Sequence, residues 1–586
     1  MKIGNRVAAA LLAAMLAGSL AVPGPAAGNP EGPSGTSGIT SITGLGTSTV
    51  TINQGAQLGI INWRSFNIAP NELTRFVQPS STSWAFNRIH DVNPSQILGS
   101  LQANGGVILL NSNGIVFGPN AQINVNGLIA SSLNLTDTDF LGGRFGFLGT
   151  ASNGWVKNFG TINAGSGGVY LLAPNVENSG VITDHDGRIV LTAGTSAMLS
   201  ARPDGRGLFV EVQAPSGMAR NLGDLIADGG EVGLYGRVVN QEGLIQANSV
   251  RERNGRIELY ATEQVNLKAG SRTAAKGGDQ GVSDGGAVVA VADMATGKAT
   301  FEQGAVIDVS GGAQGGNGGF AEVSGHDVSL GGRFKADAAP GYRGGRILID
   351  PVAVDLSGLS VSGASSLSFT SPDDLTVTGF LKLGEAGDLG AGQTGTLLFI
   401  AGTDLIFNNV DIRNSLRVYG IDPETGDRIQ IGEVDGPSRW NYLGIAGRDI
   451  VMNAGNIWMS GGGTVSFQAG RDIKLLPFEA YGPGYLYSPY LRTVGPAGGN
   501  ILLNAGGDLL APGEPDPLYA GFATIMPGIR LDGGGRLGIR ARNFFGPMVD
   551  GFETNPGFLV AKGTASVRLS GDFGKAEHYG QVTLGE

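Results

Sequence analysis

The chain has 586 residues, of which 101 are glycine and none is cysteine, and its formal net charge is −11 with only 15% charged residues. The glycines follow no Gly-X-Y period, which excludes collagen. The acidic balance and the lack of Lys/Arg clusters argue against nucleic acid as a partner. Short apolar runs separated by Gly, Asn, Asp, Ser and Thr predict an all-β chain with many tight turns.

Residues 1–27 have the organisation of a signal peptide. Lys2 and Arg6 supply a positive start, residues 7–22 form an apolar Ala/Leu-rich core, and small residues close to position 27 allow cleavage. The alternative is an N-terminal membrane anchor, but the apolar run is shorter than the roughly 20 residues that a spanning helix needs. We therefore expect an exported protein.

The central part of the chain repeats. Residues 156–162 return as residues 176–182, an offset of 20 residues. Weaker copies follow at Asn221, 43 residues after Asn178 and hence about two periods on, and at Asn240, 19 residues further. Such a period suits one coil of a parallel β-helix, in which asparagines of successive coils stack. We expect about 25 coils at the usual inter-strand spacing. A β-sandwich or a β-propeller is the alternative, but neither fold requires a sequence repeat of 20 residues.

A second repeat, Ala-Gly-x-Asp, occurs later in the chain. Its four copies lie at 401–404, 446–449, 469–472 and 505–508. A Tyr/Pro/Gly-rich insertion at 478–497 lengthens the last interval. Proline and glycine disfavour strand continuation, so we expect the insertion to loop outward. Its tyrosines are candidate contacts for a host-cell glycan or protein, although the loop could instead fold onto the flank of the rod. These candidates are Tyr481, Tyr485, Tyr487 and Tyr490.

The composition predicts no sharp domain boundaries, because a solenoid has one continuous core. After the signal peptide we expect a unit over 28–275, a β-helix continuation over 276–350 and a second β-helical stretch over 351–586. The breaks fall at a Gly-rich stretch and at the turn Ile349–Pro351.

The most distinctive region runs from Val50 to Leu133. It contains, in order, Ile61–Ile68, Ala85–Ile89 and Asn111-Ser112-Asn113-Gly114-Ile115. This ordered set resembles the two-partner secretion domain of filamentous haemagglutinin-like exoproteins, most closely the high-molecular-weight adhesin branch. The similarity continues more weakly to about residue 275.

The resemblance implies a right-handed parallel β-helix exported by the Sec translocon. It also implies recognition by a cognate outer-membrane β-barrel transporter with periplasmic adaptor domains. The family's Asn-Pro-Asn-Gly is here Asn111-Ser112-Asn113-Gly114, and serine rigidifies a turn less than proline does. We interpret Asn111 to Ile115 as a secretion determinant. The alternative is a plain β-turn between coils, and the two interpretations are compatible.

No residue pattern predicts catalysis, a cofactor or a metal. The four histidines show no ligand spacing, and without cysteine there is no zinc-type cluster. A Gly-x-Ser-x-Gly string at 281–285 lacks the strand and helix of a nucleophile elbow. The acid pairs Asp184/Asp186 and Asp373/Asp374 are typical of turns.

The sequence therefore predicts a non-enzymatic, adhesin-like protein at the cell surface or in the medium of a two-membrane bacterium. Two alternatives remain: capture of a host haem carrier or other nutrient protein, and a stalk that carries a contact-dependent effector. Residues 551–586 contain no separate globular block, which argues against the effector.

Overall fold

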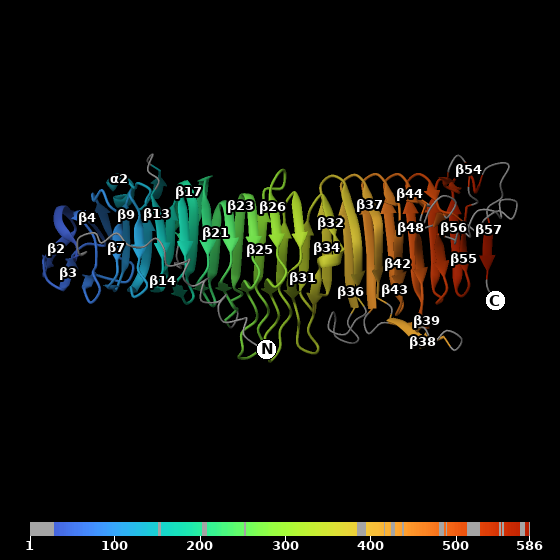
Figure 1. Cartoon of the computed structure of the whole chain (residues 1–586), viewed down its shortest axis with the longest axis horizontal. Helices are drawn as coiled ribbons and strands as arrows, with labels where there is room; N and C mark the ends of the chain where they lie inside the picture. The colour runs from blue at the N-terminus through green and yellow to red at the C-terminus, as the bar shows by residue number, and fades with distance from the viewer. Residues whose placement is uncertain are drawn as a thin grey trace, which may run out of the picture.

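The computed structural model describes residues 28–149, 154–201, 208–250, 253–383, 394–414, 416–422, 428–435, 439–476, 478–479, 486–487, 489–512, 528–549, 552–553, 556–574 and 581–584. The predicted signal peptide lies outside these residues. Figure 1 shows a straight rod, with the first coils at one end and the last at the other. No helix in the described chain is long and apolar enough to cross a membrane.

The wall of the rod has three faces, each a ladder of parallel strands. The long face consists of β4 (Leu58–Ser65), β6 (Trp84–Ile89), β9 (Gly106–Asn111), β11 (Gln122–Ser131), β14 (Thr161–Ala173), β17 (Arg188–Ala201), β21 (Glu231–Gln241), β23 (Arg256–Leu267), β25 (Ala287–Ala292), β28 (Phe320–Ser324), β31 (Arg346–Asp350), β34 (Ser366–Ser371), β36 (Thr394–Ala401), β40 (Arg439–Ala446), β43 (Gly463–Ala469), β48 (Gly499–Ala505), β51 (Arg536–Ala541) and β56 (Thr564–Leu569).

The two narrower faces use shorter strands, together with parts of the long ones. The second face consists of β7 (Ser95–Ile97), β10 (Ile115–Phe117), β13 (Trp155–Asn158), β15 (Asn175–Asn178), β19 (Met218–Asn221), the ends of β21 and β23, β26 (Lys298–Phe301), β29 (Asp327–Leu330), β32 (Ala353–Asp355), β35 (Leu375–Lys382), β37 (Leu405–Arg413), β41 (Ile450–Met452), β44 (Ile473–Leu475), β49 (Leu509–Leu510) and β52 (Phe544–Phe545).

The third face begins with β3 (Thr49–Gln54), β5 (Leu73–Val77), β8 (Ser100–Ala103), the starts of β11 and β14, β16 (Val181–Asp184), β20 (Asp224–Ile226), β22 (Leu244–Gln246), β24 (Arg272–Ala274), β27 (Val306–Asp308), β30 (Arg333–Lys335) and β33 (Ser360–Ser362). The 3-10 turn η1 (Leu356–Gly358) precedes β33. After a break that follows β33, the face resumes with the ends of β35 and β37, β42 (Gly455–Met459), β47 (Tyr490–Thr493), β50 (Ile529–Leu531), β55 (Gly557–Val560) and β57 (Gln581–Leu584).

The predicted parallel β-helix is thus confirmed, but the predicted coil length is wrong. Seventeen ladder steps on the long face lead from Ile60 to Ser566, so a coil averages about 30 residues and the rod measures roughly 80 Å at the usual strand spacing. Asn178 pairs directly with Asn221, so those 43 residues are one coil and not two. The residues that this coil has beyond a 20-residue coil leave the wall. They form an excursion through the end of β17 and β18 (Leu208–Pro215).

Later coils are lengthened in the same way. Antiparallel hairpins lie outside the ladder, formed by β38 (Leu416–Ile421) with β39 (Arg428–Val434), β45 (Phe478–Glu479) with β46 (Leu486–Tyr487), and β53 (Met548–Val549) with β54 (Phe552–Glu553). One apolar core nevertheless runs through the rod from Val50 to Val560. The long-face ladder also crosses residues 275 and 350 without interruption.

A buried asparagine ladder explains the first repeat. The side-chain amide of Asn158 donates to Asn178 Oδ1 and that of Asn178 to Asn221 Oδ1, both at 2.8 Å. Asn221 donates in turn to Gln241 Oε1 at 2.9 Å, so Gln241, and not the predicted Asn240, holds the fourth position. All four side chains are fully buried. The glycine of the repeat permits close stacking, because a Cβ on Gly180 would lie 2.1 Å from the Gly160 carbonyl oxygen.

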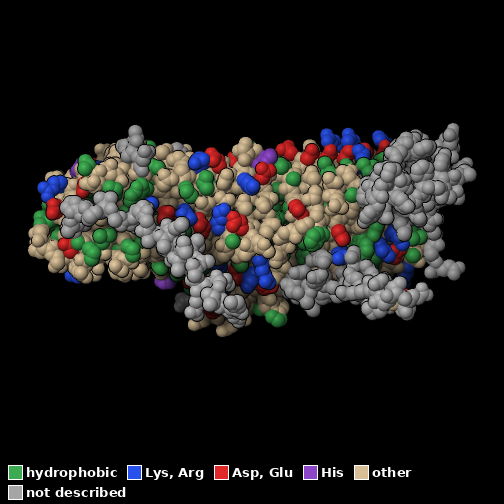
Figure 2. Space-filling view, viewed as in Figure 1, with side chains coloured by type: hydrophobic (Ala, Val, Ile, Leu, Met, Phe, Trp, Pro, Cys, Tyr) green, Lys and Arg blue, Asp and Glu red, His purple; other side chains and the backbone are tan. Residues whose placement is uncertain are grey.

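A ladder of aspartates explains the second repeat. Each carboxylate accepts the backbone N–H of the next aspartate, at 2.9–3.1 Å, through the column Asp374, Asp404, Asp449, Asp472 and Asp508. In two of the four copies the variable residue is an arginine that neutralises the aspartate one coil earlier: Arg448 Nε lies 2.7 Å from Asp404 Oδ1, and Arg471 Nε lies 2.7 Å from Asp449 Oδ1. Along the upper edge of the C-terminal half in Figure 2, blue side chains lie over red ones.

The basic partners set the protonation of this column. Hydrogen bonds from Arg448 lower the pKa of Asp404. Burial alone would raise the pKa of Asp449, but hydrogen bonds from Arg471 and Lys474 outweigh burial and hold it well below its usual range. The pKa of Asp508 is lowered in the same way by Arg542 and Asn543, against burial. These carboxylates are therefore ionised in the folded rod at neutral pH.

We expect Asn178→Ala to lower the free energy of unfolding by about 3 kcal/mol, because the buried Asn158 Nδ2 loses its Asn178 acceptor and the buried Asn221 Oδ1 loses its Asn178 donor. Urea unfolding followed by circular dichroism measures the loss. Asn163→Ala is the matched control, since Asn163 also donates to an asparagine of the preceding coil, Asn124, but on the exposed surface. Equal losses for the two variants would contradict a specific contribution from the buried ladder.

We expect acid to weaken the aspartate ladder. The folded pKa values of Asp404, Asp449 and Asp508 lie below the unfolded value near 4, so these groups stabilise the rod above about pH 4, and that contribution is lost as the pH falls through their folded values. The urea midpoint should therefore fall between pH 5 and pH 3. A variant with all three changed to asparagine should show a smaller fall, and an unchanged fall would refute the assignment.

Candidate secretion and contact sites

The first coil is closed by antiparallel strands. β1 (Glu31–Ser37) pairs with β4 and β2 (Ile39–Thr43) pairs with β3, both antiparallel to the rest of the wall. Ile39 and Ile42 pack against the end of the core. This cap covers the strand edges that would otherwise be open to pairing with another chain.

The predicted secretion motif forms a tight turn between β9 and β10. The Gly114 N–H donates to the Asn111 carbonyl at 2.9 Å, and the Asn113 N–H donates to Asn111 Oδ1 at 2.9 Å. Gly114 has a φ of +113°, and a Cβ there would lie 2.7 Å from the Trp155 carbonyl oxygen. The turn therefore forms with Ser112 at the position where the resembled motif has proline, and Ile115 begins the next strand, fully buried.

The two asparagine side chains of the motif bind the loop of the preceding coil. Asn111 Nδ2 donates to the Asn93 carbonyl and to Ser95 Oγ, each at 3.0 Å. Asn113 Nδ2 donates to the Asp91 carbonyl at 2.8 Å. Asn111 is fully buried, whereas Val92, between the two anchored residues, is 83% exposed. The motif thus shapes an exposed loop, and the Asn111 side chain itself is inaccessible to a partner.

The earlier motif residues belong to the core. Trp63 is fully buried and donates its indole N–H to Asn87 Oδ1 at 2.9 Å, which joins the two coils of the motif region. Phe66 packs edge-on against Trp63, with ring centroids 5.7 Å apart. The distinctive sequence of this region therefore reflects tight packing of the first coils.

A second apolar layer covers the outside of the long face in this domain. Its members point away from the axis but are buried: Ile60, Phe86, Ile108, Ile129, Tyr170 and Val190. The cover consists of α2 (Asp137–Leu141), β12 (Phe145–Leu148), the end of β17 and β18. We did not expect this layer. The apolar runs of β9 and β14 do not alternate with polar residues, and this pattern indicates strands that are buried on both faces.

The tyrosine-rich insertion is only partly what the sequence predicted. Tyr481 and Tyr485 lie outside the described residues, and Tyr487 belongs to the hairpin strand β46. The expectation that 478–497 loops outward is wrong for Tyr490, which lies in β47 on the ladder and stacks on Trp458 with centroids 5.8 Å apart. Apolar Leu491 points into the core, which draws this part of the insertion back into the wall.

The acid pairs named from the sequence take structural roles. Asp374 begins the aspartate ladder, and Asp186 adopts a φ of +62° in a turn and pairs with Arg253 at 2.8 Å. Burial raises the pKa of Asp184 to about 8, and its Oδ2 accepts the Arg188 N–H at 3.0 Å. No group of three or more His, Asp or Glu side chains in the described part of the chain could hold a metal ion.

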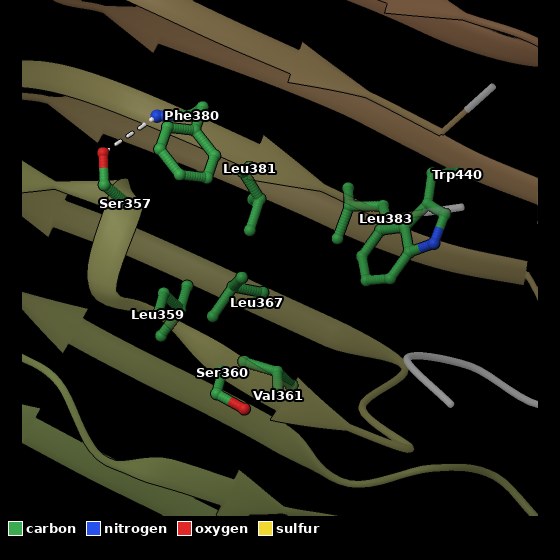
Figure 3. A pocket seen from close by; sticks show the side chains of 9 residues that line it. All are labelled: Ser357, Leu359, Ser360, Val361, Leu367, Phe380, Leu381, Leu383 and Trp440. Carbon is green, nitrogen blue, oxygen red and sulfur yellow. Dashed lines mark hydrogen bonds between the residues drawn. The ribbon is translucent and has the colours of Figure 1, made fainter. Parts of the chain in front are cut away.

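One apolar pocket opens where the third face is interrupted between β33 and β35. Figure 3 shows its lining, with Leu359, Val361, Leu381 and Trp440 around a space of about 160 Å³. The Phe380 N–H donates to Ser357 Oγ at 3.3 Å at its edge. The described residues that line it include no acid, base or histidine.

Part of the chain is similar in sequence to known proteins. Residues 28–279 match the family described as TPS secretion domain. A heme/hemopexin-binding protein of Haemophilus influenzae (strain ATCC 51907 / DSM 11121 / KW20 / Rd) is 31% identical over 258 residues, 41% of this chain and 28% of that protein. A second Haemophilus influenzae heme/hemopexin-binding protein is 43% identical over 86 residues, 15% of this chain and 9% of that protein.

Among solved structures, the HMW1 secretion domain from Haemophilus influenzae is 27% identical, with a TM-score of 0.49 over 60% of this chain and 95% of that chain. The chain spans less than a third of the length of the curated relatives it matches.

The N-terminal part of the parallel rod thus has an antiparallel cap and a structured turn at Asn111–Gly114. Because residues 28–279 match the TPS secretion domain, this part of the chain is a two-partner secretion domain.

Proposed function

We propose that the Sec translocon exports this chain and that its residues 28–279 then engage a cognate outer-membrane transporter with periplasmic adaptor domains. The match of those residues to the TPS secretion domain carries the proposal. The anchored turn supports it, because a rigid loop around Val92 gives a partner a fixed surface to recognise. Outside the cell, the rod remains at the surface or enters the medium.

The exported rod would act as a non-enzymatic, adhesin-like binding protein. Its wall is a regular stack of strands, and the segments that differ from coil to coil are hairpins outside the ladder. Binding residues are commonly carried on such protruding segments of a rigid scaffold. We place the contact for a host glycan or protein on the β45–β46 hairpin and the tyrosines Tyr481, Tyr485 and Tyr487.

Capture of a host haem carrier is the second candidate. Two relatives carry the name heme/hemopexin-binding protein, at 31% and 43% identity. The overlap covers only 28% and 9% of those proteins, so this support is narrower than the support for the secretion route.

The secretion assignment predicts that Asn111→Ala/Asn113→Ala lowers the secreted fraction at least tenfold in cells that express the transporter. The substitutions release the loop that contains Val92, and immunoblots of medium and cells measure the result. Asn163→Ala is the control for loss of an asparagine from an exposed site in the same domain. Normal secretion of the double variant, with protease resistance of the rod unchanged, would contradict a role for the turn.

The contact assignment predicts that serine at Tyr481, Tyr485 and Tyr487 together reduces adhesion to host cells or a glycan array at least fivefold. Tyr342→Ser, on another loop, is the control and should bind normally. The triple serine variant leaves Tyr490 unchanged, because that residue belongs to the wall. Unchanged adhesion at equal secretion would refute the assignment, and loss of hemopexin capture without loss of adhesion would favour the second candidate.

A further inference from the structure

The outer surface of the long face carries an open groove near the middle of the rod. The strands β23, β25, β28 and β31 begin with Arg256, Ala287, Phe320 and Arg346, and direct pairing places these residues in one outward column, one coil apart. The short side chain of Ala287 leaves a gap between Arg256 and Phe320, which lie two ladder steps or roughly 10 Å apart. The resulting groove has a volume of about 390 Å³.

Stacked glycine-rich loops form one side of this groove. Residues 276–286 and 310–319 connect the third face to the long face, and Figure 1 shows loops of this region extending below the rod. Hydrogen bonds join the two loops: the Asn317 N–H donates to Asp284 Oδ1 at 2.7 Å, and the Gly285 N–H donates to the Asn317 carbonyl at 2.9 Å. Asp284 and Gly285 line the groove. The polar groups of this side are therefore held in place before a ligand binds.

The groove presents polar side chains that the fold does not use. The exposed side chains of Asn254 and Arg346 line it and hydrogen-bond to no described residue. Arg256 donates through Nε to Glu258, which leaves its two terminal nitrogens as donors. One aromatic ring completes the lining. The Arg346 guanidinium lies over one face of Phe320, 5.6 Å from the ring centroid, so the opposite face of the ring is turned toward the groove.

The chemistry of the lining selects one class of ligand. A lipid needs a mainly apolar site, whereas this lining has a single aromatic ring among glycines and polar side chains. A polyanion needs an excess of basic residues, but Asp284 offsets Arg346, and Glu258 offsets Arg256. Carboxylate, amide and guanidinium groups together supply the acceptors and donors that neighbouring hydroxyl groups require. An aromatic ring beside them suits a ligand with one apolar face.

We infer that this groove binds a monosaccharide unit of a neutral glycan. Phe320 packs against the apolar face of the sugar ring, and Asp284, Asn254 and Arg346 hydrogen-bond to its hydroxyl groups. A groove of about 390 Å³ falls in the range of roughly 300–1,000 Å³ for small-molecule sites. The inference goes beyond the proposed contact on the β45–β46 hairpin, which lies several coils further along the rod, and does not depend on it.

Arg346→Ala and Arg343→Ala form a matched pair that tests the groove. Both arginines are exposed, but Arg346 lines the groove, whereas Arg343 lies outside it on the neighbouring loop. The probes are the methyl glycosides of glucose, galactose, mannose and N-acetylglucosamine, and saturation-transfer NMR with the full chain measures their binding. At least one glycoside should bind the parent with a millimolar dissociation constant. Arg346→Ala should weaken that binding at least tenfold, and Arg343→Ala should stay within twofold of the parent.

Glucuronate, measured with the unmodified chain, tests the class of ligand. Its carboxylate should bring no gain in affinity, because acids and arginines balance in the lining. Failure of all four glycosides to bind, equal binding by Arg346→Ala, or tighter binding of glucuronate overturns the inference. The triple serine variant of Tyr481, Tyr485 and Tyr487 should bind the glycosides like the parent. Its adhesion to host cells therefore tests the proposed hairpin contact separately.

Discussion

The hydrogen-bonded step from one coil to the next is the constraint on which the structure depends. In a parallel ladder, equivalent residues lie about 4.8 Å apart, so the side chain at one inward position meets the same position of its neighbours. A buried polar residue is stable there only if the column supplies partners. Asn178 between Asn158 and Asn221 meets this condition with amides alone. The aspartate column meets the same condition in two ways. Backbone N–H groups of the column donate to its carboxylates, and arginine side chains pair with them from the surface of the rod.

The same constraint determines where the chain can vary. Additional residues within a strand would shift the register of the whole face, but residues added between strands cost only loop-closure entropy. The excursions at β18, β38–β39 and β45–β46 accordingly leave the wall and return to it in register. A scaffold of this kind keeps its core while its protruding segments change.

The two halves of the rod use different chemistry around the same ladder. The N-terminal half has a second apolar layer, with residues such as Phe86 and Tyr170 buried outside the wall beneath α2 and β18. The C-terminal half carries a column of ion pairs along its edge, as between Arg471 and Asp449, and the N-terminal half has ion pairs too, as between Arg220 and Glu242. An apolar outer layer resists changes in pH and salt, whereas ion pairs do not.

The sequence by itself determined the class of fold, the turn at Asn111–Gly114 and the resemblance of the N-terminal part to a secretion domain, because turn residues and short repeats are local properties of the chain. Spacing did not determine the register: Gln241 replaces Asn240 in the ladder, and the 43 residues after Asn178 make a single coil. Only the tertiary structure decided these points, together with the place of Tyr490 in the wall and the layer over the long face. Each depends on contacts between coils, and the distance along the chain between two stacked residues is set by excursions whose lengths the local pattern does not encode.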